Sequence, residues 1–275
     1  MEHKPSEHYT VDLFTVISIS SLAYLLATFL HEMGGHGLSC LLQGAKLLEL
    51  GAFYASCDYS GLSDLSIRVV AVAGPVISLL TGVICYLILP RLPERAFHWK
   101  YGLWLLGTLG LLIAAGYLLF SGVSGIGDFG FSRDGLLYQA APEALWRVIL
   151  AILGAGAYLL VVALAIRKMD RHVIGGQGVE RVRQAQRLAL TSYLTGGIVS
   201  VLIGFLNPLG IIIVLISAAA ASLGGTSALL WMMQWLNRKA VSPAPYLQLA
   251  RSWSWIIAGI GFTLLYALVL GPSII

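Results

Sequence analysis

The sequence predicts an all-α polytopic membrane protein with about seven transmembrane helices. Apolar residues make up 58% of the chain and charged residues only 11%, and the mean hydropathy is +0.84. An ordinary water-soluble domain carries about 25% charged residues. The apolar residues also gather in runs of roughly 20 residues or more, the length that crosses a bilayer as a helix. Together these observations exclude a typical soluble globular protein.

Seven apolar runs are the expected spans, at residues 13–42, 69–90, 101–121, 146–166, 188–206, 209–236 and 253–272. Tryptophan or arginine marks most of their ends, as is usual at a membrane interface. Residues 1–12 form an N-terminal tail of mixed charge with no cleavable signal peptide, so we expect the first span to remain. Asn207 and Pro208 indicate either a tight turn between two spans or a break within a re-entrant pair.

The basic residues predict how the chain is oriented. Thirteen of the 17 lysines and arginines fall on one side of the expected spans, many of them in a basic loop at residues 167–187. Cytoplasmic loops carry such an excess, so we expect a multi-pass protein of a bacterial cell membrane with a cytoplasmic N-terminus. No basic surface is interleaved with stacking aromatics. The bilayer is therefore an expected partner, and nucleic acid is not.

The most informative motif is His31-Glu32-Met33-Gly34-Gly35-His36, near the end of the first span. An ionisable side chain inside a bilayer costs roughly 3 kcal/mol or more, so a cluster of them indicates a functional site. A catalytic zinc commonly takes two histidines and a carboxylate, while a nearby glutamate removes a proton from water. We therefore predict that His31 and His36 bind Zn²⁺ and that Glu32 is the general base.

The spacing of the two histidines requires a distorted helix. The usual zinc motif places its histidines four residues apart, on one helix face. Here they are five residues apart, which separates them by about 140° around an ideal α-helix. A single-turn π-bulge absorbs one extra residue and brings such positions together. Gly34 and Gly35 permit that distortion, so the motif predicts a π-bulge.

The third metal ligand is predicted from the direction of the spans. The first and third spans run the same way, so the side chains near their C-terminal ends lie on the same side of the membrane. Asp128 follows the third span, and no Asp or Glu follows Glu180. Asp128 is therefore the expected ligand, with a short set of alternatives in the two loops on that side, namely Asp58, Asp64, Asp134 and Glu143.

The three cysteines predict no further chemistry. Their number is odd and no Cys-x-x-Cys spacing occurs, so neither a disulfide framework nor a thiolate zinc site is indicated. Cys40 and Cys85 are expected to be small packing residues. The role of Cys57, which precedes Asp58 in the first loop, is left undecided by the sequence.

Residues 13–130 resemble the site-2-protease family of intramembrane zinc metalloproteases. The likeness rests on the motif in a membrane helix, on Gly35-His36, on Ala73-Gly74-Pro75 opening the next span, and on Gly127-Asp128-Phe129-Gly130. The six residues from His31 to His36 also resemble the lengthened zinc motif of dipeptidyl peptidase III. The family resemblance implies a three-helix metalloprotease core at residues 13–145, followed by C-terminal helices at 146–275, with Asp128 as the remaining zinc ligand. Ser78 stands where the family commonly has Asn.

Two functions are consistent with these observations. The first is an intramembrane zinc metalloprotease that cleaves transmembrane or membrane-proximal segments of protein substrates, with residues 48–63 offering an extended edge to the substrate. The alternative is a non-catalytic membrane protein, either a pseudoprotease that binds transmembrane helices or a transporter that uses the His/Glu cluster as an ion relay. Charge counting puts the site towards the outer face, whereas the family generally works nearer the cytoplasmic side.

Overall fold

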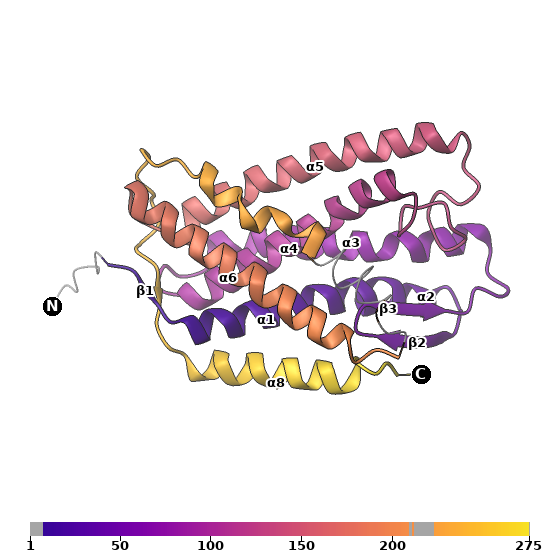
Figure 1. The fold of residues 1–275 in the computed structure, drawn as a ribbon, viewed down its shortest axis with the longest axis horizontal. Coiled ribbons are helices and arrows are strands. Elements are labelled where there is room, and N and C mark those ends of the chain that lie inside the picture. The colour runs from indigo at the N-terminus through magenta and orange to yellow at the C-terminus, as the bar shows by residue number, and fades with distance from the viewer. Residues whose placement is uncertain (1–7, 209–210, 212–222, 275) are drawn as a thin grey trace.

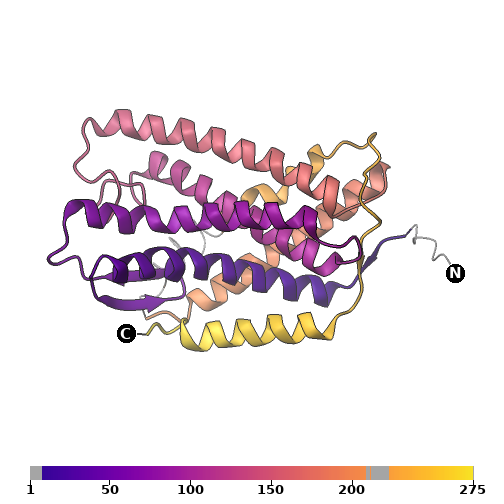
Figure 2. The same ribbon diagram turned by 180° about the vertical axis from the view of Figure 1, so that it is seen from behind.

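The chain forms a bundle of long helices in a computed structural model that describes residues 8–208, 211 and 223–274 (Figures 1 and 2). Helix accounts for 68% of the residues and strand for little, which confirms a mainly α-helical fold. Within the described residues, five helices are long and apolar enough to cross a membrane, at Leu13–Leu42, Asp64–Arg91, Phe97–Ser124, Glu143–His172 and Gly178–Gly204. A shorter apolar helix, Trp253–Val269, follows. These helices make the chain a multi-pass membrane protein.

The first span consists of three segments, namely α1 (Leu13–Phe29), the π-helical η1 (Leu30–Gly37) and α2 (Leu38–Leu42). The remaining helices are α3 (Asp64–Ile88) with a 3₁₀ turn η2 (Leu89–Arg91), α4 (Phe97–Ser124), α5 (Glu143–His172), α6 (Gly178–Gly204) and α8 (Trp253–Val269). Local chemistry sets several of their ends. Asp12 caps α1 by accepting a hydrogen bond from the Thr15 amide at 3.0 Å, and Ser63 caps α3 in the same way.

The first half of the predicted span at residues 209–236 lies outside the described residues except for residue 211. Its described C-terminal part forms two 3₁₀ turns, η4 (Ser227–Leu230) and η5 (Met232–Trp235). Before it, α6 ends at Gly204 and a hydrogen-bonded turn leads to Asn207, where the sequence predicts a break. The structure therefore confirms the end of a helix at this point.

The helices are layered so that apolar side chains also cover the outside. Helices α5 and α8 lie on opposite sides of the bundle, with α1, α3, α4 and α6 between them (Figures 1 and 2). Trp104, Leu105 and Leu109 of α4 are completely buried at the centre. The outer helices expose many large apolar side chains, among them Ile152, Leu159 and Leu160 on α5 and Ile257, Leu264 and Leu265 on α8. Such a continuous apolar exterior suits hydrocarbon and would be anomalous in water.

Buried hydroxyl and indole groups cross-link the helices. Tyr86 of α3 bonds Thr108 of α4 at 2.7 Å, and the Trp104 indole donates to the Ala165 carbonyl of α5 at 3.0 Å. Because hydrocarbon offers no hydrogen-bond partner, each of these polar groups must be satisfied by another part of the protein. These bonds fix the rotation of α4, the helix that leads into the candidate site.

Each end of the bundle carries its own short β-sheet. At one end, β1 (Thr10–Val11) pairs in parallel with β4 (Gln248–Leu249). At the other, β2 (Leu47–Gly51) and β3 (Tyr54–Cys57) form an antiparallel hairpin, and Leu50 also bridges Ile274. Strand β1 and the hairpin therefore lie at opposite ends of the bundle, and Ile274 lies beside the hairpin (Figure 1).

The expected basic loop at residues 167–187 is mostly helical. Helix α5 continues to His172 and α6 begins at Gly178, so the connection itself spans only residues 173–177. The completely buried Arg181 explains the tight turn, because it reaches back from α6 to Asp170 on α5 at 2.5 Å. The basic residues therefore lie on the ends of two helices.

Candidate metal centre

The zinc-like motif lies within the π-helical segment η1, as its five-residue spacing predicts. A π-turn holds i to i+5, so the side chains of His31 and His36 come to the same side of the helix. Their Nε2 atoms are 3.3 Å apart. The extra residue of the motif is therefore absorbed by the backbone without separating the two imidazoles.

Close backbone contact between η1 and α3 holds this distorted turn in place. A Cβ atom on Gly35 would lie 2.5 Å from the Gly74 Cα atom, and one on Gly74 would lie 2.3 Å from Nε2 of His36. Real Cβ atoms essentially never approach so closely. Two glycines facing one another are thus required for α3 to lie directly against the histidines.

Asp128 reaches the histidines from the loop that follows α4. Helix α4 ends at Ser124 and is capped by Gly125 with φ +81°, and Gly127 has φ +88°, a conformation that favours glycine. Asp128 Oδ2 lies 3.2 Å from His31 Nε2 and 3.5 Å from His36 Nε2. Burial raises the pKa of the Asp128 carboxyl, but the two nearby imidazoles, above all that of His36, outweigh it and hold the pKa below its usual value.

The geometry of these three atoms fits a metal ion. A tetrahedral zinc with bonds of about 2.1 Å has its ligand atoms about 3.4 Å apart, and the three separations here are 3.2, 3.3 and 3.5 Å. Oδ2 of Asp128 is buried and has no hydrogen bond of acceptable geometry within the described residues. His31, His36 and Asp128 form the group that could hold a metal ion in the described part of the chain.

The other nitrogen of each imidazole is held by a neighbour on α3. Nδ1 of His36 donates to the Val70 carbonyl at 2.8 Å, and Nδ1 of His31 lies 2.9 Å from the Ser78 hydroxyl. A donated proton on Nδ1 leaves the Nε2 lone pair free for an ion, as in most protein zinc sites. Both Nε2 atoms are the ones that face Asp128.

A cavity of about 220 Å³ lies against this group. Glu32, His36 and Asp128 line it together with Tyr117, and the hairpin contributes Tyr54. Glu32 is buried, and its carboxylate makes no hydrogen bond to a described residue. The predicted base is thus beside the predicted ligands and free to bond a molecule in the cavity.

The remaining acidic candidates do not join the group. Asp134 lines the same cavity, but neither it nor Asp58, Asp64 or Glu143 forms part of the ligand cluster in the described chain. Asp58 instead accepts from the Ser60 amide at 2.9 Å, and Glu143 pairs with Arg147. Of the carboxylates that the sequence leaves open, the structure brings only Asp128 to both histidines.

Sequence reasoning missed two residues at this site. Ser78 differs from the Asn common in the family at its position, yet its hydroxyl contacts His31. Tyr117 is not singled out at all, although its ring stacks on His31 with centroids 4.7 Å apart. A serine four residues after Gly74 is a usable signal, because i and i+4 share a helix face. Nothing in the local sequence marks Tyr117.

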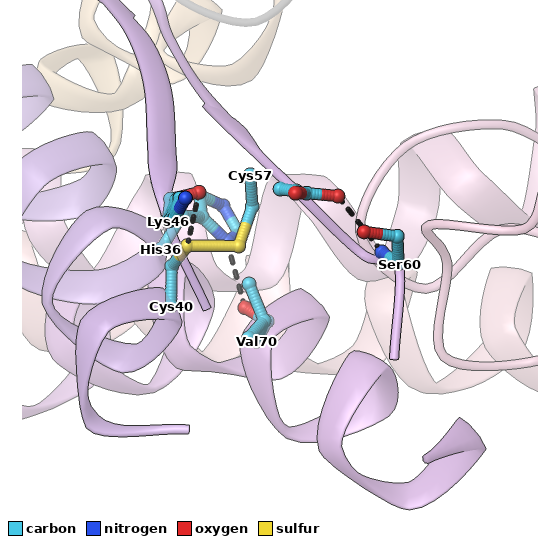
Figure 3. The surroundings of a disulfide bond; sticks show 7 residues. His36, Cys40, Lys46, Cys57, Ser60 and Val70 are labelled. Atoms are coloured by element: carbon cyan, nitrogen blue, oxygen red, sulfur yellow. Dashed lines mark hydrogen bonds between the residues drawn. A yellow bond between two sulfur atoms is a disulfide. The ribbon is translucent and has the colours of Figure 1, made fainter. Parts of the chain in front are cut away.

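The expectation that the cysteines form no disulfide is wrong. Cys40 of α2 and Cys57 of β3 are joined by a disulfide, and Cys85 remains a free buried thiol. Figure 3 shows this disulfide beside His36, whose ring is hydrogen-bonded to the Val70 carbonyl. The number of cysteines does not reveal this pairing. Cys57 comes close to Cys40 only because the β2–β3 hairpin turns the chain back towards α2. The disulfide ties the hairpin to the turn that follows the motif.

Comparisons with known proteins add no assignment to this geometry: no protein-family model matches the chain, and neither curated proteins nor solved structures give a match.

Proposed function

We propose that the protein is an intramembrane zinc metalloprotease. The observation that carries this proposal is the set of three ligand atoms, 3.2 to 3.5 Å apart, whose imidazoles are held through their opposite nitrogens. A polar cluster that merely stabilised the bundle would not need two Nε2 atoms and a buried carboxylate oxygen to converge. The resemblance to site-2 proteases points to the same chemistry.

In this proposal, His31, His36 and Asp128 hold Zn²⁺. When bound, the ion supplies Lewis acidity, which polarises the scissile carbonyl and acidifies water. Ser78 and the Val70 carbonyl keep the imidazoles in the required orientation, and the carbonyl also fixes the tautomer of His36. These residues bind and orient and take no part in proton transfer.

Glu32 is the general base of the proposed reaction. Its carboxylate accepts a proton from water as the water oxygen bonds to the carbonyl carbon of the peptide. The same carboxyl then gives that proton to the amide nitrogen as the C–N bond breaks. A positioned acid or base of this kind contributes about 10²- to 10⁴-fold to the rate.

The hairpin suits a peptide substrate in extended form. Tyr54 and Ala55 of β3 line the cavity, and β3 pairs only with β2 among the described residues. A membrane-spanning helix hides its carbonyls in its own hydrogen bonds, so it must unwind before cleavage. The free edge of β3 can bond such an unwound segment by strand addition. The substrate is therefore a transmembrane or membrane-proximal segment of another protein.

Two independent observations support a cavity that opens away from the cytoplasm. Most lysines and arginines lie at the opposite end of the bundle, which favours a cytoplasmic location for that end. The Cys40–Cys57 disulfide lies at the cavity end, and disulfides persist in oxidising compartments. We therefore infer that substrate reaches the site from the extracytoplasmic side.

The deciding experiment is cleavage of a reconstituted transmembrane substrate in proteoliposomes, with zinc content measured on the same preparations. We expect Glu32→Gln to retain zinc and lose about 10²- to 10⁴-fold in rate. His36→Ala should lose both zinc and cleavage. Glu143→Gln is the matched control, because Glu143 is exposed and lies outside the cavity. Equal cleavage by wild type and Glu32→Gln, or wild-type protein without bound zinc, would overturn the proposal in favour of a non-catalytic role.

A further inference from the structure

Tyr117 occupies a position at the site that packing alone does not explain. It lies on α4, and its ring is nearly parallel to that of His31, with an interplanar angle of 17°. The same side chain lines the cavity with Glu32 and Asp128, and both carboxylates lie close enough for their charges to act on its hydroxyl. Tyr117 therefore presents a phenol beside both the proposed base and the proposed ligands.

The Tyr117 hydroxyl differs from every other tyrosine hydroxyl in the described membrane helices. Each of the others has a hydrogen-bond partner within the protein, as found for Tyr24, Tyr86, Tyr101, Tyr158, Tyr193 and Tyr266. Tyr117 has no such partner in the described chain. The Tyr117 side chain is only partly buried, and its hydroxyl is not one of the fully buried polar atoms, so it stays accessible to a bound molecule. The partner of Tyr117 is thus expected to be a molecule in the cavity.

We propose that Tyr117 is a catalytic residue that donates a hydrogen bond to the carbonyl oxygen of the scissile peptide as that oxygen gains negative charge. This inference rests on the proposed protease function. When the water oxygen bonds to the carbonyl carbon, the π-electron pair of the C=O bond moves to its oxygen, and the Tyr117 O–H group stabilises it there. The pair returns when the C–N bond breaks, and Tyr117 keeps its proton throughout.

Two substitutions of Tyr117 separate hydrogen-bond donation by its hydroxyl from packing of its ring. Removing one donor to a developing oxyanion costs about 10²- to 10³-fold in kcat. Tyr117→Phe deletes the donor but keeps the ring that stacks on His31. Tyr117→Leu deletes both. If the hydroxyl acts as proposed, the phenylalanine variant loses most of the rate that the leucine variant loses.

The test compares Tyr117→Phe, Tyr117→Leu and Tyr158→Phe in proteoliposomes. Tyr158 is a matched control, because it lines an adjoining cleft with Tyr117 but bonds the Ala228 amide at 3.0 Å. We expect Tyr117→Phe to retain zinc and KM while kcat falls about 10²- to 10³-fold. A second readout is the equilibrium affinity for a phosphinic peptide, whose tetrahedral anion imitates the charged intermediate. It should weaken by a similar factor in Tyr117→Phe and stay unchanged in Tyr158→Phe.

Three outcomes would overturn the inference. The first is Tyr117→Phe at wild-type kcat while Glu32→Gln is inactive, which leaves the protease proposal standing. The second is a rate loss confined to Tyr117→Leu, which would assign Tyr117 a packing role on His31. The third is equal phosphinic-peptide affinity in wild type and Tyr117→Phe. Failure of the protease proposal itself is distinguished by equal rates in wild type and Glu32→Gln.

Discussion

Gly35 and Gly74 meet backbone to backbone, so that a Cβ atom on Gly35 would lie 2.5 Å from the Gly74 Cα atom. This contact joins the π-helical turn η1 to α3, the helix that supplies the hydrogen-bond partners of both histidines. The spacing of η1 and α3 therefore sets the positions of the proposed ligands.

We predict that Gly35→Ala disrupts the site while Gly34→Ala is tolerated. A methyl group at Gly35 must push α3 away, and such overpacking costs about 1–3 kcal/mol. At Gly34 the nearest atom to an added Cβ is 3.6 Å away, an ordinary contact. Zinc content and thermal unfolding of both variants check this. Equal zinc content in the two variants would contradict the packing argument.

Ser78→Ala should weaken zinc binding about 10- to 100-fold with little change in fold, because loss of an outer hydrogen bond frees the His31 ring to rotate. Competition with a zinc chelator measures the affinity. Ser200→Ala is the control, since Ser200 is equally buried in a membrane helix but has no hydrogen-bond partner within the described residues. If Ser78→Ala binds zinc as tightly as the wild type and Ser200→Ala do, Ser78 does not orient His31.

Removing the disulfide with Cys40→Ser and Cys57→Ser should lower the unfolding free energy by about 3 kcal/mol, the value expected for a loop of this length. Cys85→Ser provides a comparison at a free thiol. Maleimide labelling of the denatured wild type before and after reduction checks the pairing itself. Labelling of all three cysteines without a reductant would refute it.

Arg181→Ala should destabilise the protein by about 3 kcal/mol, because it removes a completely buried guanidinium that pairs with Asp170 and donates to the carbonyls of Gly176, Asn237 and Ala240. Arg183→Ala should cost less than about 1 kcal/mol, since its pair with Glu180 is exposed. Thermal unfolding in detergent compares the two. Similar melting temperatures would show that the buried pair does not hold α5 to α6.

The proposed orientation, with the cavity on the extracytoplasmic side, predicts opposite labelling at the two ends of the helix bundle. In a Cys85→Ala background, Ser60→Cys should react with a membrane-impermeant maleimide added to intact cells. Arg183→Cys should react only after permeabilisation. Both positions are exposed, so accessibility within the fold does not differ. The reverse pattern would place the cavity on the cytoplasmic side.

Much of the candidate site is predictable because it depends on local spacing and on the direction of spans. The five-residue interval between His31 and His36 requires a π-turn, and the structure contains one. The shared direction of the first and third spans favours Asp128 and leaves Asp58, Asp64, Asp134 and Glu143 as alternatives, and the family resemblance points to Asp128 among them. The π-turn and the side of the membrane need only helix geometry and membrane thickness.

The contacts that sequence reasoning missed depend on how helices rotate against one another. Ser78 and Tyr117 touch His31 only because glycines let α3 lie close and buried hydrogen bonds fix α4. The Cys40–Cys57 pair likewise depends on the return of a hairpin. No pattern within one segment contains these relationships.

The origin of the three proposed ligands has a consequence for biosynthesis. His31 and His36 emerge from the ribosome with the first span, whereas Asp128 follows the third. A nascent chain that ends before Asp128 presents two imidazoles but no third ligand atom. Full coordination in the proposed metal site must therefore await membrane insertion of α3 and α4, so that a partly synthesised chain cannot assemble it.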